Sequence, residues 1–330
     1  MIRNFPLALP AALAALALPL PAIAQDAPSP NQIVAEANAE EWVKIAPEDL
    51  LVMTLAPDRD GDARQVVIQL LPEPFSQGWV ANIRTLARAG WYDGISVNRA
   101  QDNYVVQWGD PNYDNPEAEG AAKALPEGLR VMDESDYVDV VRAAEPGDDK
   151  IVLWHPRPDL RDIYAESATF SKGWPIGIAT TPDTKAVTRW PVHCYGMVGV
   201  GRGMSPDTGS GAELYTVIGH APRHLDRNIA LVGRVVSGIE HLSSLPRGSG
   251  ALGFYTSEEA SERTPIRSIR VASDLPAAEQ PEFEYLSTES ETFSRYAEAR
   301  ANRRDPFFIV PAGGADICNI PVPVRATPAE

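Results

Sequence analysis

The part of the chain that decides the fold is residues 97–110, VNRAQDNYVVQWGD. It places an arginine, an aromatic residue and a glutamine at spacings of five and three, as Arg99, Tyr104 and Gln107. Apolar and polar residues alternate along the segment, which is typical of a half-buried β-strand. The segment ends in a Gly-Asp turn. These residues are the starting point for predicting both the fold and the functional site.

The residues before this segment predict a hairpin and then a helix. Strand patterns at residues 50–55 and 65–71 enclose an acidic, glycine-containing turn at 58–62, as in a β-hairpin. An amphipathic helix should follow and end at Gly90, since helices often end at glycine. Its apolar residues recur every three or four positions, at Val80, Ile83, Leu86 and Ala87.

This order of elements and motifs resembles the cyclophilin-type peptidyl-prolyl isomerases. The first half of the family pattern, in residues 48–117, consists of Val80-Ala81-Asn82-Ile83, Tyr92-Asp93-Gly94, Val97-Asn98-Arg99, Tyr104 and Gln107-Trp108-Gly109-Asp110. The second half, in residues 191–272, consists of Gly199-Val200-Gly201-Arg202, residues 211–219, Ala221-Pro222-Arg223-His224-Leu225-Asp226 and residues 232–238. The motifs keep the family's order and nearly its spacing, so together they are specific.

The resemblance implies a mainly β fold, a closed eight-stranded antiparallel β-barrel capped by two helices. Between the two halves we expect an irregular insertion packed on the barrel, and after them a helical C-terminal extension. Helical composition covers residues 32–43 and 288–304. The predicted regions are a signal peptide (1–24), a leader with a short helix (25–47), a cyclophilin-like domain (48–272) with an insertion (118–190), and the extension (273–330).

The resemblance also implies the reaction and its residues. Arg99 would hydrogen-bond the prolyl amide during its rotation, and Gln107 would orient Arg99. The substrate-binding residues implied in this way are Tyr104, Val105, Gly201, Arg202, Glu213, Tyr215, His224 and Leu225. This chemistry needs no cofactor and no metal, and the pairs His193-Cys194 and His220/His224 lack a matching third metal ligand.

Three positions depart from the family pattern: Glu213, His224 and Ile229. A carboxylate at Glu213 could pair with Arg99 and either orient it or hold it away from substrate. The sequence therefore leaves two alternatives to an isomerase. One is a non-catalytic module that binds proline-containing segments in the same groove, and the other is a structural envelope protein with an inert barrel.

The N-terminus has the features of an export signal. Arg3 precedes an apolar stretch at residues 7–20, and Ala22-Ile23-Ala24 fits a cleavage site after Ala24. No later segment is long and apolar enough to span a bilayer. We therefore expect a periplasmic or secreted protein, a monomer, whose partners are proline-containing peptide segments of exported proteins.

Charge and cysteine content agree with that expectation. The formal net charge is -16, which argues against nucleic-acid binding because phosphate backbones would be repelled. The chain has two cysteines, Cys194 and Cys318. They could form a disulfide in an oxidising compartment, tying the C-terminal tail to the domain, or remain as two buried thiols.

Overall fold

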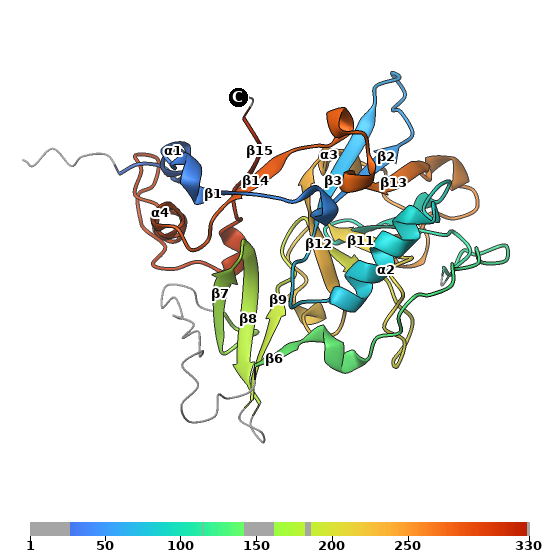
Figure 1. Ribbon diagram of the computed structural model, residues 1–330, viewed down its shortest axis with the longest axis horizontal. Coiled ribbons are helices and arrows are strands. Elements are labelled where there is room, and N and C mark those ends of the chain that lie inside the picture. Colours follow the sequence, from blue (N-terminus) through green and yellow to red (C-terminus); the bar gives the residue numbers. More distant parts are fainter. Residues whose placement is uncertain (1–26, 114, 142–161, 182–185, 329–330) are drawn as a thin grey trace, which may run out of the picture.

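The computed structural model of the chain describes residues 27–113, 115–141, 162–181 and 186–328. The predicted signal peptide, residues 1–24, lies outside the described residues. Figure 1 shows a barrel on the right and a smaller body on the left, which is built from described segments before and after the barrel strands and from the insertion. No helix in the described ranges is long and apolar enough to cross a membrane.

Eight antiparallel strands form the barrel sheet, in the order β13-β2-β3-β12-β10-β11-β5-β4. The strands are β2 (Leu50–Leu55), β3 (Arg64–Leu70), β4 (Ser96–Ala100), β5 (Val105–Gly109), β10 (Met197–Val200), β11 (Leu214–Val217), β12 (Leu231–Ser237) and β13 (Ile266–Val271). The sheet closes on itself, because Gly94 N–H donates to Ile266 O at 3.0 Å and Ile266 N–H donates to Ile95 O at 2.8 Å. The predicted mainly β fold with an eight-stranded barrel is confirmed.

Strand β2 shows why the barrel needs the rest of the chain. Side chains alternate between the two faces of a strand, so Leu51 and Met53 point into the barrel core. Leu50 and Val52 point outward, yet they are also buried. Residues of the C-terminal extension cover this outer face: Phe283, Tyr285 and Val324. An outer face this apolar would otherwise be exposed to water.

Two helices contribute side chains to the barrel core. The main one is α2 (Gln77–Arg88), whose buried side chains Trp79, Ile83 and Leu86 belong to the barrel core. It is followed by Gly90, with φ +64°, a conformation that glycine adopts without strain. The short α3 (Glu240–Ser243) adds Leu242 to the same core.

The insertion differs from the prediction, because it is not irregular throughout. It contains a sheet in the order β6-β9-β8-β7, made of β6 (Asp139–Val141), β7 (Ser167–Ser171), β8 (Trp174–Thr180) and β9 (Val187–Pro191). Lys172 and Gly173 connect β7 to β8, both with positive φ, as in a two-residue hairpin turn. Pro175 and Pro191 obscured the pattern, since proline inside a run weakens a strand prediction.

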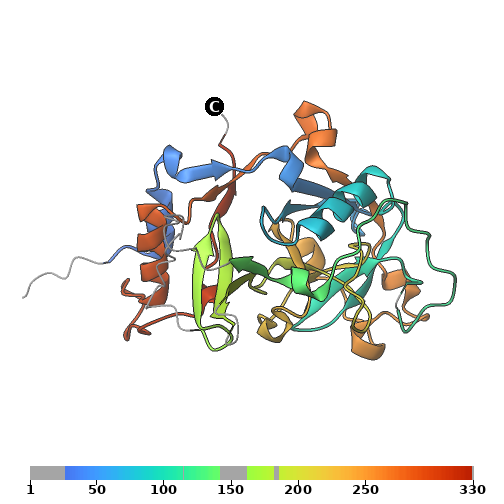
Figure 2. The same ribbon diagram turned by 60° about the horizontal axis from the view of Figure 1, so that its bottom comes forward.

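Described segments that precede and follow the barrel strands in the sequence form the smaller body (Figures 1 and 2). Its elements are α1 (Pro30–Ala35), β1 (Trp42–Lys44), β14 (Phe283–Leu286), α4 (Glu291–Ala301) and β15 (Val324–Ala326), with a sheet in the order β1-β14-β15. The helix expected over 32–43 ends early, because Trp42 pairs with Leu286 in the sheet. One hydrophobic cluster joins Trp42 to Trp174 of the insertion and Phe293 of α4.

Short 3-10 helices connect these elements, at Ala39–Glu41, Pro47–Asp49, Glu134–Tyr137, Arg223–Leu225, Ala251–Gly253, Ala260–Glu262, Ala272–Asp274, Ala277–Glu279 and Ile317–Asn319.

Candidate active site

A groove of about 570 Å³ lies on the outer face of the barrel. Its lining residues are Arg99, Tyr104, Val105, Gln107, Asn115, Pro116, Ala118, Gly201, Arg202, Glu213, Tyr215, Leu225, Ile229, Leu252 and Phe254. All the residues predicted for catalysis and substrate binding are among them, except His224. The ring of His224 lies beside the groove, nearly parallel to that of Tyr104, with 6.3 Å between their centroids.

Paired residues on four neighbouring strands form the floor of the groove. Arg99 pairs with Gln107, Gln107 pairs with Tyr215, and Tyr215 pairs with Gly199 across neighbouring strands. Because cross-strand partners share a face, these residues form one row across β4, β5, β11 and β10. Gly199 is required there, since a Cβ on it would come within 2.3 Å of the Tyr215 side chain. The next row contains Val105, whose neighbour Val106 points into the barrel core.

Three acceptors hold the guanidinium of Arg99. Its Nε donates to the carbonyl of Leu252 at 2.7 Å, its Nη1 donates to Gln107 Oε1 at 3.2 Å, and its Nη2 donates to Gln101 Oε1. The rings of Tyr104 and Phe254 lie 5.6 and 5.5 Å from its central carbon. An arginine has five N–H donors, so two remain for a ligand. Burial lowers the pKa of Arg99, but a guanidinium stays charged at neutral pH.

The side chain of Glu213 is bonded to the backbone of β5. Its Oε1 accepts a hydrogen bond from the backbone N–H of Asp110 at 2.8 Å. The carboxylate lies over Gly109, where a Cβ would come within 1.9 Å of it. Among the described residues, no ion pair joins Glu213 to Arg99. The guanidinium therefore keeps its charge available in the groove.

Sequence reasoning missed Gln101, which holds Arg99, and several residues that line the groove. Gln101 is two positions after Arg99, on the same strand face, and this spacing could have identified it. Leu252 is 153 residues from Arg99 and contributes only its carbonyl, so no local pattern indicates it. The rim residues Asn115 and Pro116 follow the Gly-Asp turn without a recognisable motif.

A family model described as "Cyclophilin type peptidyl-prolyl cis-trans isomerase/CLD" matches residues 61–271. The chain belongs to this cyclophilin family. The match spans the barrel strands from β3 to β13 and includes every groove residue. The protein is accordingly a peptidyl-prolyl cis-trans isomerase, as the sequence predicted.

Two cyclophilins similar to this chain cover different shares of it. "Peptidyl-prolyl cis-trans isomerase B" of Bacillus subtilis (strain 168) is 26% identical over 115 residues, 34% of this chain and 80% of that protein. The crystal structure of cyclophilin AquaCyp293 from Hirschia baltica covers 89% of this chain and 100% of its own, with 22% identity and a TM-score of 0.62. That likeness shows a shared fold that extends beyond the barrel.

A Cryptosporidium parvum cyclophilin-type peptidyl-prolyl cis-trans isomerase, crystallised in the presence of the dipeptide Ala-Pro, is more distant. It covers 67% of this cyclophilin and 98% of its own chain, with 12% identity and a TM-score of 0.37.

Proposed function

We propose that this cyclophilin isomerises X-Pro bonds of exported proteins, with Arg99 as the catalytic residue. The observation that supports this role is the way Arg99 is held: three N–H groups are bonded to the protein, and two remain for a ligand in the groove. The carboxylate of Glu213, which could have neutralised the guanidinium, is bonded to the backbone of Asp110 instead.

The reaction is rotation about an amide bond, with a barrier of about 18–20 kcal/mol that comes from amide resonance. In the twisted state the prolyl nitrogen has lost conjugation, so it becomes a better hydrogen-bond acceptor. A fixed, charged donor therefore binds the twisted state more strongly than the planar one. An acceleration of about 10,000-fold requires about 5.5 kcal/mol of such preferential binding. Gln107 would supply part of it by orienting Arg99.

The apolar part of the groove fits the ring of the proline. Val105 and Tyr215 are buried there, and three partly buried side chains pack against them: Tyr104, Leu225 and Ile229. The ring of His224 would support that of Tyr104 from outside. Gly201 leaves room at the edge, since a Cβ there would come within 2.8 Å of Glu213 Cβ and 3.4 Å of Gln107 Nε2. The neighbouring Arg202 donates to Asn228 O and forms a polar rim for the peptide backbone.

The catalytic role is tested by a protease-coupled assay on an Ala-Pro peptide. We expect Arg99→Ala to reduce kcat/KM by about 100-fold or more, the usual effect of removing a transition-state donor. Arg99→Lys should lose activity as well, because a lysine ammonium cannot reproduce the planar arrangement of N–H donors on a guanidinium. The matched control is Arg88→Lys, an exposed arginine on α2 that pairs with Glu48 and Asp274. Full activity of Arg99→Ala would contradict the mechanism.

Two features support export to an oxidising compartment. One is the predicted signal peptide. The other is a disulfide between Cys194 and Cys318, because such bonds persist mainly outside the cytosol. Fractionation of cells that express the full chain tests the proposal. We expect the mature protein in the periplasmic or secreted fraction with Gln25 as its first residue, whereas a cytoplasmic protein that starts at Met1 would overturn it.

A further inference from the structure

The wall of the groove is hydrogen-bonded to a residue outside the barrel strands. Tyr215 lines the groove from β11, and its hydroxyl lies 2.9 Å from Nε2 of His193. The two rings are nearly parallel, with an interplanar angle of 9°. His193 follows β9, the last strand of the insertion, and is itself buried, with 1% of its surface exposed. The hydroxyl therefore points away from the apolar groove.

The hydrogen bonds of Asp226 settle which atom is the donor between Tyr215 and His193. Asp226 Oδ1 lies 3.0 Å from the backbone N of His193 and 2.9 Å from its Nδ1. A carboxylate only accepts, so Nδ1 carries a hydrogen. Burial lowers the pKa of His193, so the ring is neutral and its Nε2 is an acceptor. Tyr215 therefore donates its hydroxyl hydrogen to His193.

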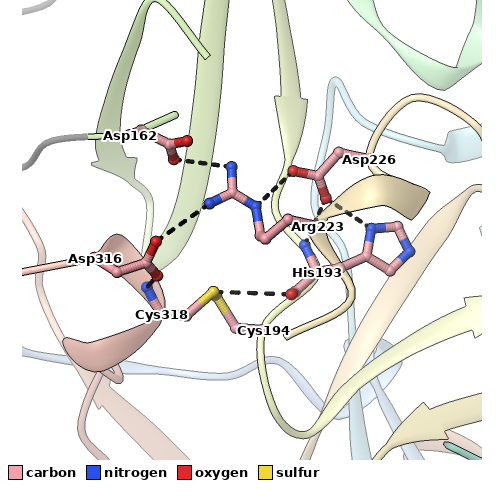
Figure 3. Close-up of a disulfide and its surroundings, with 7 residues drawn as sticks. All are labelled: Asp162, His193, Cys194, Arg223, Asp226, Asp316 and Cys318. Atoms are coloured by element: carbon pink, nitrogen blue, oxygen red, sulfur yellow. Dashed lines mark hydrogen bonds and ion pairs between the residues drawn. A yellow bond between two sulfur atoms is a disulfide. The ribbon is translucent and has the colours of Figure 1, made fainter. Parts of the chain in front are cut away.

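Charged groups from three segments hold Asp226 and His193 in place (Figure 3). Arg223 Nε donates to Asp226 Oδ2 at 2.7 Å. The same guanidinium pairs with Asp162 at 2.8 Å and lies 3.7 Å from Asp316, a residue of the C-terminal tail. The disulfide Cys194–Cys318 fixes that tail beside His193. Segments far apart in the sequence thus determine where the His193 ring lies.

We propose that His193 is a positioning residue of the isomerase: through the Tyr215 hydroxyl it sets the angle of the proline-pocket wall. This inference rests on the proposed role of Tyr215 in binding the proline ring. A ring held by packing alone keeps more rotational freedom than one that is also hydrogen-bonded, and ordering that ring on binding would weaken affinity. The insertion and the tail therefore serve the isomerase by holding His193 under the groove.

Two substitutions of His193 separate this role from a structural one. In His193→Asn, the side-chain amide replaces Nδ1 and still donates to Asp226, but it cannot reach Tyr215. In His193→Gln, the amide replaces Nε2 and can still accept from Tyr215, while the bond from Nδ1 is lost. Both remove one buried hydrogen bond, and His193→Gln removes the one to the charged Asp226, so it should lower the melting temperature at least as much as His193→Asn does. Only His193→Asn breaks the link to the groove.

The measurements are KM and kcat on an Ala-Pro peptide, together with binding of the same peptide in the absence of the coupling protease. We expect His193→Asn to raise KM about 3- to 10-fold more than His193→Gln does, the range that one net hydrogen bond allows, with little change in kcat. In a Tyr215→Phe background, His193→Asn should raise KM no further. His241→Asn, on α3 and outside the groove, is the matched control.

The proposal is overturned if the two His193 variants raise KM equally, or if His193→Asn keeps its full effect without the Tyr215 hydroxyl. Should the His193 variants fail to fold, Tyr215→Phe alone decides the matter, because it removes only the hydroxyl that bonds to His193. A raised KM supports the proposal, and an unchanged KM overturns it. These results are distinct from a failure of the proposed mechanism, which would appear as full activity of Arg99→Ala.

Discussion

Glu213 is bonded to the backbone N–H of Asp110 at 2.8 Å, and this contact keeps its carboxylate over β5. In this contact residue 213 acts as a hydrogen-bond acceptor. The position departs from the family pattern, yet the hydrogen bond it makes is one that an amide oxygen could also accept. This explains how the groove accommodates an acid beside Arg99.

Glu213→Gln should consequently leave kcat/KM within about threefold of the natural protein, because the amide oxygen can still accept from Asp110. Glu213→Leu should instead cost about 1–3 kcal/mol of stability, since it leaves that buried N–H without an acceptor. Urea unfolding and the peptide assay measure the two effects. A large gain in turnover with Glu213→Gln would show that the carboxylate restrains Arg99 after all.

Gln101→Leu should lower kcat and leave KM nearly unchanged. Gln101 holds Nη2 of Arg99, and a less ordered guanidinium is a poorer donor in the twisted state. We expect a loss of about 3- to 10-fold, the equivalent of one net hydrogen bond. In an Arg99→Ala background the same substitution should have no further effect. An undiminished effect there would mean that Gln101 acts on the fold and not through Arg99.

Removing the disulfide should destabilise the protein as a whole. Cys194 and Cys318 are 124 residues apart, so the bond closes a long loop in the unfolded chain. A double Cys194→Ser/Cys318→Ser variant should lose about 2–4 kcal/mol of unfolding free energy. Unfolding of the natural protein with and without a reductant provides the control. Equal stability of the oxidised and reduced forms would contradict this prediction.

Stability should fall as the solution becomes acidic. Burial lowers the pKa of His193, which faces Asp226, Arg223, His224 and the Tyr215 hydroxyl. The unfolded chain therefore binds this proton at a higher pH than the folded chain does. The stability contributed by neutral His193 is present above about pH 6.5 and is lost as the pH falls below it.

Asp226 acts in the same direction at lower pH. Burial alone would raise its pKa, but the hydrogen bonds from His193 and the charge of Arg223 together lower it. Urea unfolding at about pH 7.5 and pH 5 measures the His193 contribution. His193→Asn should show a shallower pH dependence than the natural protein over that interval, and an identical slope for the two proteins would refute the assignment.

The C-terminal extension and the insertion show the limits of local patterns. The helix expected over 288–304 is present as α4, because its apolar residues recur with helical spacing. The strands of the insertion were missed, since their stability comes from packing against Trp42 and Phe293, at the two ends of the chain. Strand preference depends more on such neighbours than helix preference does.

By itself, the sequence determined the barrel and the row of residues at its groove. The motif in residues 97–110 indicated Arg99 and Gln107, and the β4–β5 hairpin that pairs them on one face forms within this segment. Only the tertiary structure decided that Glu213 is bonded to Asp110 and that His193 lies behind Tyr215. Those contacts join residues that are not neighbours on any one element, so they depend on how the barrel, the insertion and the tail pack together.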